Sequence, residues 1–164
     1  MLKGELLIMS NGDNNLSWKV AEVELVYNSK VKATDRPKIT CSKDAELILR
    51  DNWNNRQISL REEFNALYLD QSNRVVGFYN ICKGGISATL VDVRLAFIAA
   101  LKLKSSAMII AHNHPSGNLK PSQADINLTD KFKQAGEVLD IGVIEHIILT
   151  PDEGYYSFAD EGLM

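Results

Sequence analysis

Hydrophobic residues in this chain fall into two patterns, and the first of them predicts β-strands. Short runs in which apolar residues alternate or follow one another are typical of strands. These runs cover residues 20–26, 64–69, 75–82, 107–111, 143–149 and 155–158. Residues 70–73 are polar and turn-forming, so the second and third runs should form a hairpin. The run at 107–111 is apolar throughout, which indicates a central strand covered on both faces.

The second pattern is apolar spacing of three and four residues, which predicts helices. One helix should begin with Ser42 as its N-cap and end near Trp53. Residues 88–104 carry apolar side chains most of the way round, so we expect this helix to be largely buried. The helix after Ser122 has an apolar stripe at Ala124, Leu128, Phe132, Ala135 and Leu139. Helices interleaved with strands predict an α/β sandwich with a mixed sheet.

Composition narrows the class of protein. The chain has 164 residues, of which 45% are hydrophobic and 24% charged, as in an ordinary globular domain. We expect residues 1–38 to form an N-terminal strand or hairpin extension and residues 39–164 to form one domain.

The net charge of −3 gives no general attraction to nucleic acid. Cys41 and Cys82 form no Cys-x-x-Cys, so a disulfide framework or a thiolate zinc site is not expected. No secretion leader or membrane segment is predicted, so we expect a cytoplasmic location without membrane contact.

Candidate chemistry follows the strand at 107–111. His112 and His114 are two residues apart, so in an extended segment their side chains lie on the same face. Pro115 favours extended backbone at the residue before it. Asp125 adds a carboxylate eleven residues after His114. Two imidazoles and one carboxylate form a three-ligand set with one open position, which is typical of catalytic zinc.

Spacing alone leaves alternatives to catalytic zinc open. The two histidines could be hydrogen-bonded within a turn, because residues 115–118 are turn-forming. Ser122 and Asp125 also match a helix start, where the acid only caps backbone N–H groups. Two histidines and a carboxylate can hold iron(II) in an oxygenase, but those sites usually lie on β-barrels. A zinc base deaminase is excluded because its His-x-Glu and Pro-Cys-x-x-Cys signature is missing.

Hydrolysis at a zinc site would need further groups. The metal would lower the pKa of a bound water toward ~7 and polarise a carbonyl. A carboxylate could move the proton from that water to the leaving amine. Glu62 and Glu63, at the start of the 64–69 strand, are the candidates, although either residue taken alone is more commonly a solvated strand end. The hydroxyl of Ser122 could stabilise the oxyanion or could simply cap the helix.

Taken together these residues resemble the JAMM (JAB/MPN-type) metallopeptidase motif, an upstream Glu followed by His-x-His-x7-Ser-x-x-Asp. More narrowly, the chain resembles RadC-like proteins over about residues 40–164. The matching stretches are residues 62–70, 111–117, 121–125, 145–148 and 156–157.

The resemblance implies a fold and a set of roles. The fold is an α/β architecture, a curved mixed sheet flanked by helices, similar to cytidine deaminases. The cofactor would be Zn²⁺, held by His112, His114 and Asp125. Glu62 would be the general base, since the family's acid lies two residues before the phenylalanine, and Ser122 would assist the oxyanion. The activity implied is hydrolysis of peptide or isopeptide bonds, with a peptide or an isopeptide-linked protein as substrate.

The chain also departs from the RadC-like pattern. The helix-hairpin-helix segment that such proteins commonly carry is not found before this region, which weakens a DNA-repair function. Glu145 replaces the usual aspartate before His146, and we expect His146 to be structural, with hydrogen bonds in the site wall. The alternative function is a DNA-repair-associated or protein-binding accessory domain without peptidase activity. DNA binding is possible but not favoured by charge, and the 20–26 strand could pair in a homodimer.

Overall fold

The computed structural model describes residues 29–84, 91–152 and 154–164, and within them strands alternate with helices. The elements are η1 (Ala33–Asp35), α1 (Ser42–Asn52), β1 (Glu63–Leu69), β2 (Val75–Lys83), α2 (Val93–Leu103), β3 (Ala107–Asn113), α3 (Gln123–Leu139), β4 (Gly142–Leu149) and β5 (Tyr155–Ser157). The strand predicted at residues 20–26 lies outside the described residues. None of the described helices combines the length and the apolar character needed to cross a membrane.

The five strands form one mixed sheet in the order β2-β1-β3-β4-β5. β1 pairs antiparallel with both β2 and β3, β3 pairs parallel with β4, and β4 pairs antiparallel with β5. The predicted hairpin and the predicted mixed α/β sheet are therefore confirmed. β3 is the central strand and all seven of its residues are buried, as its apolar run predicted. α3 makes the crossover between the parallel strands β3 and β4.

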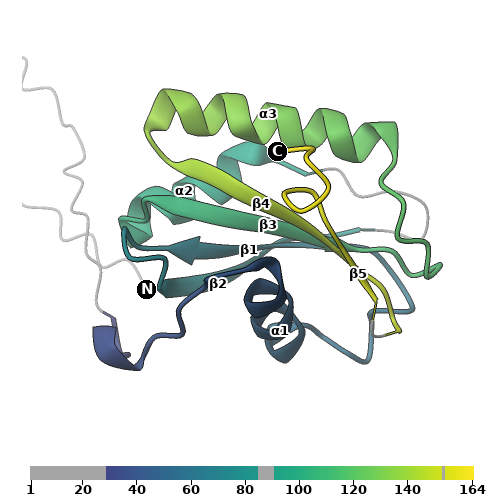
Figure 1. Cartoon of the computed structure of the whole chain (residues 1–164), viewed down its shortest axis with the longest axis horizontal. Helices are drawn as coiled ribbons and strands as arrows, with labels where there is room; N and C mark the ends of the chain where they lie inside the picture. The colour runs from purple at the N-terminus through teal and green to yellow at the C-terminus, as the bar shows by residue number, and fades with distance from the viewer. Residues whose placement is uncertain (1–28, 85–90, 153) are drawn as a thin grey trace, which may run out of the picture.

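Helices cover both faces of the sheet (Figure 1). We call the side under α2 and α3 the α3 face and the opposite side, under α1, the α1 face. Strand alternation divides the apolar core between them. The α3 face holds Phe64, Ala66, Tyr68, Met108, Ile110 and Phe132, and the α1 face holds Leu49, Trp53, Leu67, Leu69, Ile109 and Ala111. In β1 and β3 the side of each core residue therefore follows from whether its number is odd or even.

α3 faces the sheet along a line that differs from the predicted stripe. Its buried residues are Thr129, Phe132 and Gly136, whereas Ala124 and Leu139 are exposed. Leu128 and Ala135 pack against the core beside Phe132, so the predicted stripe is confirmed in its middle and wrong at its two ends. A Cβ at Gly136 would collide with the carbonyl oxygen of Ile141, so the glycine lets α3 lie close to the start of β4. Asp125 lies four residues before Thr129 and so shares this inward line.

The starts of two helices correct the sequence interpretation. Ser42 was predicted as the N-cap of α1, but the N-cap is Cys41, and the Ser42 hydroxyl donates to Asp160 at 2.5 Å. The acceptor at this helix start is Asp44, whose carboxylate takes hydrogen bonds from the N–H and hydroxyl of Thr40. The rest of the prediction for α1 is confirmed, since the helix ends at Asn52, just before Trp53.

The helix predicted at residues 88–104 begins later and is less buried than expected. Asp92 is its N-cap, so Val91 is not helical, and residues 88–90 lie outside the described residues. Val93, Ala96, Phe97 and Ala100 are buried against the sheet, but Leu95, Ile98 and Leu101 are exposed. The prediction of a largely buried helix was wrong because, among the described residues, the sheet covers one side of α2.

Candidate metal site

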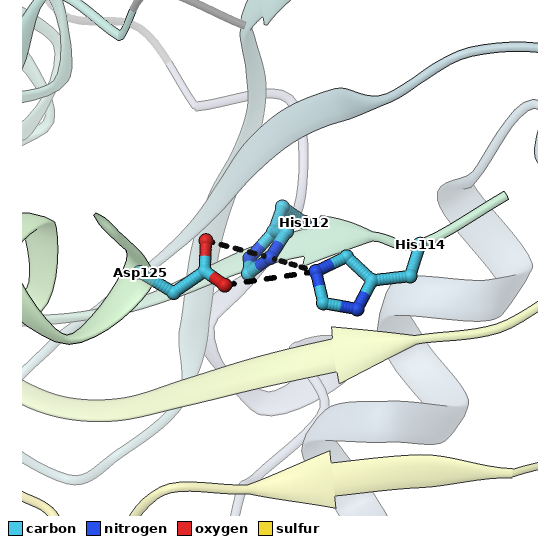
Figure 2. Close-up of side chains that lie close together, drawn as sticks. All are labelled: His112, His114 and Asp125. Atoms are coloured by element: carbon cyan, nitrogen blue, oxygen red, sulfur yellow. Dashed lines mark hydrogen bonds and ion pairs between the residues drawn. The ribbon is translucent and has the colours of Figure 1, made fainter. Parts of the chain in front are cut away.

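Three candidate ligands meet beyond the C-terminal end of β3. His112 lies in β3, His114 is the first residue after β3, and Asp125 is in the first turn of α3 (Figure 2). The His112 Nε2 atom lies 3.0 Å from His114 Nε2 and 3.3 Å from Asp125 Oδ1. His114 Nε2 lies 3.7 Å from Asp125 Oδ2. These atoms all lie within 4.8 Å of one another, which is the arrangement of residues that could hold a metal ion.

The spacing of the ligand atoms fits a tetrahedral ion. Ligands at about 2.0–2.1 Å from zinc stand about 3.3 Å from each other, which falls within the spread of separations found here. His112 is 5% exposed, whereas the side chains of His114 and Asp125 keep 14% and 16% of their surface in contact with solvent. The cluster is therefore closed on the protein side and open on the other, as a site with a free coordination position requires.

Asp125 is both a candidate ligand and part of a helix cap. The Ser122 hydroxyl accepts from the Asp125 N–H, and the Asp125 carboxylate accepts from the Ser122 N–H, which completes a capping box. The Ser122 hydroxyl also lies 2.7 Å from Asp125 Oδ2 and donates to it. The helix-cap interpretation is therefore correct, but it does not compete with metal binding. The cap holds Oδ2 and leaves Oδ1 directed at His112.

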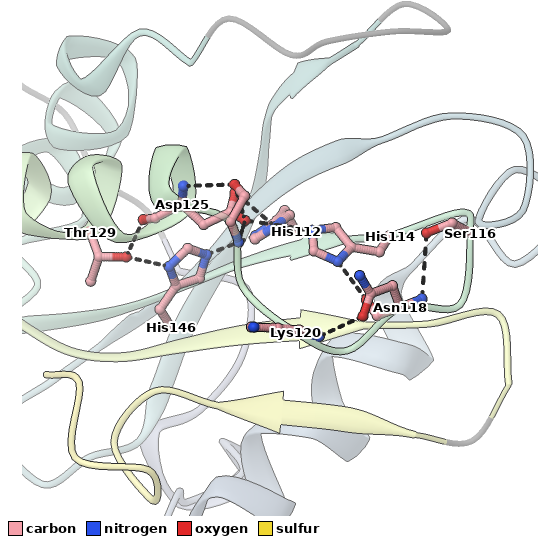
Figure 3. A network of polar contacts seen from close by, with 9 residues as sticks. His112, His114, Ser116, Asn118, Lys120, Asp125, Thr129 and His146 are labelled. Atoms are coloured by element: carbon pink, nitrogen blue, oxygen red, sulfur yellow. Dashed lines mark hydrogen bonds and ion pairs between the residues drawn. The ribbon is translucent and has the colours of Figure 1, made fainter.

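Hydrogen bonds behind the ligands hold the two imidazoles (Figure 3). His112 Nδ1 lies 2.8 Å from Nε2 of His146, and His146 Nδ1 lies 2.7 Å from the hydroxyl of Thr129. His114 Nδ1 lies 2.6 Å from the carbonyl oxygen of Asn118. In both ligand rings Nδ1 therefore contacts a group away from the cluster, and Nε2 points to the centre shared by the three ligands. The expectation that His146 is hydrogen-bonded in the site wall is confirmed.

Burial and hydrogen bonds in the cluster shift the pKa values of three side chains. The hydrogen bond with Asp125 raises the pKa of His114 above its ordinary value, and the nearby Glu62 carboxylate adds to this. Burial alone would raise the pKa of Asp125, but its contacts with the His112 and His114 rings outweigh burial and hold that pKa below the usual range. Burial lowers the pKa of His146 well below its ordinary value, so this ring is neutral.

Glu62 and Glu63 lie on different sides of the sheet. Phe64, two residues after Glu62, stacks on His112 with ring centroids 6.0 Å apart, so parity places Glu62 on the α3 face. Its charge acts on His114 and on Cys82. Glu63 is 3% exposed on the α1 face, within reach of Asn80 and of the Arg61 and Lys83 cations. Of the two candidate bases, only Glu62 is on the side of the ligands.

Asn113 stands between the two histidines and faces the other way. It is fully buried, and its side-chain oxygen accepts from the Glu63 N–H at 2.7 Å. Its amide nitrogen donates to the carbonyl oxygens of Ile58 and Arg61, at 2.7 and 2.9 Å. One side chain thus fastens the segment that carries Glu62 to the strand that carries the ligands. We name this set of contacts the Asn113 clamp.

Sequence reasoning missed the Asn113 clamp and the contact of Thr129 with His146. A signal for the first was present, because the residue between two same-face histidines must point to the opposite face. A signal for the second was the spacing of four residues from Asp125 to Thr129, which places both on one side of a helix. Neither signal names a partner, since Ile58 and His146 are distant in the sequence from the residues they contact.

Residues 39–163 match the sequence profile of the RadC-like JAB domain. The chain belongs to this family. A UPF0758 protein of Flavobacterium johnsoniae is 47% identical over 126 residues, which cover 77% of this chain and 53% of that protein. A UPF0758 protein of Porphyromonas gingivalis is 43% identical over 63% of this chain and 46% of its own length.

The UPF0758 protein YfjY of Escherichia coli is a further relative, 43% identical over 63% of this chain and 64% of its own length. The match therefore spans about half the length of the first two relatives and less than two thirds of YfjY. The family confirms the resemblance drawn from the histidine motif, and the α/β fold agrees with a JAB domain.

Proposed function

We propose that this domain is a zinc-dependent hydrolase of peptide or isopeptide bonds. The observation that carries the proposal is the open cluster of His112, His114 and Asp125 with the Glu62 carboxylate on the same face. A metal held between solvent and a buried wall, next to a carboxylate that is not a ligand, is the usual composition of a hydrolytic zinc site.

Each residue has a distinct task in this proposal. His112, His114 and Asp125 would hold the ion, which when bound would lower the pKa of a water toward ~7 and polarise the scissile carbonyl. Glu62 accepts the proton of the attacking water and delivers it to the departing amine nitrogen. Ser122 assists the oxyanion by donating its hydroxyl hydrogen, which must first leave the Asp125 carboxylate that accepts it in this structure.

Zinc is proposed rather than iron because of the surrounding chemistry. Two imidazoles and one carboxylate suit either metal. An oxygenase needs no proton-transferring carboxylate beside the metal, whereas hydrolysis of an amide needs one to protonate the amine. The position of Glu62 on the α3 face therefore favours the hydrolytic metal.

Elemental analysis of the purified protein, compared with His114→Ala, tests the metal. We expect near-stoichiometric zinc in the wild type and loss of it in the variant. Iron in place of zinc would turn the proposal toward an oxygenase, and no metal in either protein after zinc addition would refute the site.

Hydrolysis is then tested with the zinc-loaded protein on a peptide library and on isopeptide-linked substrates, with Glu62→Gln as the control. Cleavage by the wild type that the variant lacks supports the proposal. If loaded wild type and variant are equally inactive on every substrate, the hydrolase is wrong. An accessory domain that binds a partner through this region would then account better for the site.

A further inference from the structure

Short contacts between ring nitrogens join all three histidines of the chain, and a series of hydrogen bonds leads to His112. The series begins at the backbone carbonyl oxygen of Asp125, which can only accept. The Thr129 hydroxyl lies 2.7 Å away and donates to this oxygen. A hydroxyl has one hydrogen, so toward Nδ1 of His146, at 2.7 Å, the Thr129 oxygen must accept. The proton between them is therefore on His146 Nδ1.

The next proton follows from the environment of His146. Its side chain is fully buried and contacts the rings of Phe64 and Phe158, with centroids 5.8 and 4.5 Å away. An imidazolium is costly in such surroundings, so the ring carries a single proton. With that proton on Nδ1, Nε2 is an acceptor. His112 Nδ1, at 2.8 Å, must then donate to it.

A neutral His112 with its proton on Nδ1 has a free lone pair on Nε2. That atom is the one directed at His114 and Asp125. His114 also has its proton on Nδ1, because Nδ1 lies 2.6 Å from the Asn118 carbonyl oxygen, which can only accept. Two lone pairs that face each other at 3.0 Å need a cation between them. A proton can fill that place in the metal-free protein, and a metal ion would replace it.

We propose that Thr129 and His146 are positioning residues that hold His112 in the Nδ1–H tautomer and so prepare its Nε2 atom to bind the metal. The inference rests on the proposed metal site. The series starts at the backbone of Asp125 and ends at the imidazole of His112, so it ties two ligands on different elements to each other. Outer contacts of this kind fix the tautomer and orientation of a ligand ring.

Matched pairs of variants test the proposal. Thr129→Val keeps the shape of the side chain and removes the acceptor for His146, whereas Thr129→Ser keeps the hydroxyl. His146→Phe keeps a ring between Phe64 and Phe158 but cannot accept from His112. His146→Gln supplies a carboxamide oxygen that can accept from His112 and an N–H group that can donate to Thr129. Circular dichroism and thermal unfolding first establish that each variant is folded.

The first readout uses the metal-free protein at mildly alkaline pH. Two-bond proton–nitrogen correlation spectra separate the Nδ1–H and Nε2–H tautomers, and single His→Gln variants assign the three histidines. We expect His112 as Nδ1–H in the wild type and in Thr129→Ser. We expect a mixture of tautomers in Thr129→Val and His146→Phe. An Nε2–H tautomer in wild type, or an unchanged tautomer in both folded variants, would overturn the inference.

The second readout is zinc affinity, measured by competition with a chromophoric chelator. Loss of an outer hydrogen bond to a ligand typically weakens metal binding by about 10–100-fold, which is the effect expected for Thr129→Val and His146→Phe. Thr129→Ser and His146→Gln should stay closer to wild type. Folded Thr129→Val that binds zinc as tightly as wild type would contradict the proposal. Should the wild type itself bind no zinc, the metal site falls, and the tautomer spectra still decide the inference.

Discussion

The two faces of the sheet differ most where β1 begins and β3 ends. On the α3 face, His112 and His114 point to a shared centre with Asp125. On the α1 face, one residue away in sequence, Asn113 is fully buried in the clamp that holds residues 58–63. The same parity separates Glu62 from Glu63. Adjacent residues therefore differ in role, since those on the α3 face belong to the proposed metal site and those on the α1 face join two segments of the fold.

The difference between the two faces shows how the domain can hold the Glu62 carboxylate, which precedes β1, close to β3. On the α1 face the Asn113 side chain is satisfied by the protein itself, because it uses its oxygen and both amide hydrogens on three backbone groups. The polar groups of the α3 face leave ligand atoms directed at a common point and open to solvent. A site that must hold its groups in a fixed geometry would be supported by such hydrogen bonds on the opposite face.

The largest expected contrast is between Glu62→Gln and Glu63→Gln. A general base typically contributes about 10²–10⁴-fold to rate, so Glu62→Gln should lose that much kcat while zinc content and stability stay near wild type. Glu63→Gln should keep most activity and instead lower the free energy of unfolding by about 1–2 kcal/mol, since it weakens a buried polar cluster. Steady-state kinetics and urea unfolding check both, and a reversal of the two outcomes would refute the assignment of faces.

Removal of the Asn113 clamp should affect both faces. Asn113→Ala leaves three backbone groups, two of them in buried contacts, without the partner they have here, which should cost about 2–4 kcal/mol of stability. Because the Glu62 segment is then less well held, kcat should fall while the histidine ligands still bind zinc. Urea unfolding, zinc titration and kinetics measure the three effects. Normal kcat in a folded Asn113→Ala protein would show that the clamp does not position Glu62.

The pH dependence should arise from the α3 face. Because the folded-state pKa of His114 is raised, its contact with Asp125 stabilises the metal-free protein fully below the unfolded value of about 6.5. That stabilisation is lost as the pH rises through the folded pKa. The difference in free energy of unfolding between wild type and His114→Gln should therefore be larger at pH 6 than at pH 9. Urea unfolding in the presence of a chelator measures this difference.

Zinc competes with the proton on His114, so its apparent affinity should rise with pH over the same range. An affinity that does not change with pH across this range would contradict the raised pKa. The same titration on Asn113→Ala is the control, since a variant of the α1 face should keep the slope.

The smallest expected effect distinguishes two tasks of Ser122. Loss of a serine cap typically costs about 1 kcal/mol, and the Ser122 N–H still holds Asp125 in Ser122→Ala. Stability should fall by that amount and zinc affinity only slightly. If Ser122 also assists the oxyanion, kcat falls by about 10²–10³-fold with KM little changed. A fall in stability alone would leave Ser122 as a helix cap.

Local patterns determined much of this structure in advance. The hairpin of β1 and β2, the buried strand β3 and the capping box at Ser122 were predictable because they depend on residues close in sequence. The shared face of His112 and His114 followed from the period of a strand. The choice of Glu62 over Glu63 came from family resemblance, and parity in the folded sheet now places them on opposite faces.

Tertiary structure decided what depends on distant partners. Apolar spacing alone cannot show how far a helix is covered, so the stripe of α3 was predicted too long and α2 was predicted too buried. Hydrogen bonds from Asn113 to Ile58, and from His112 to His146, join residues 55 and 34 positions apart. A side chain's type and spacing say which groups it can offer to a partner, but only the packing of the elements brings a particular donor and acceptor within bonding distance.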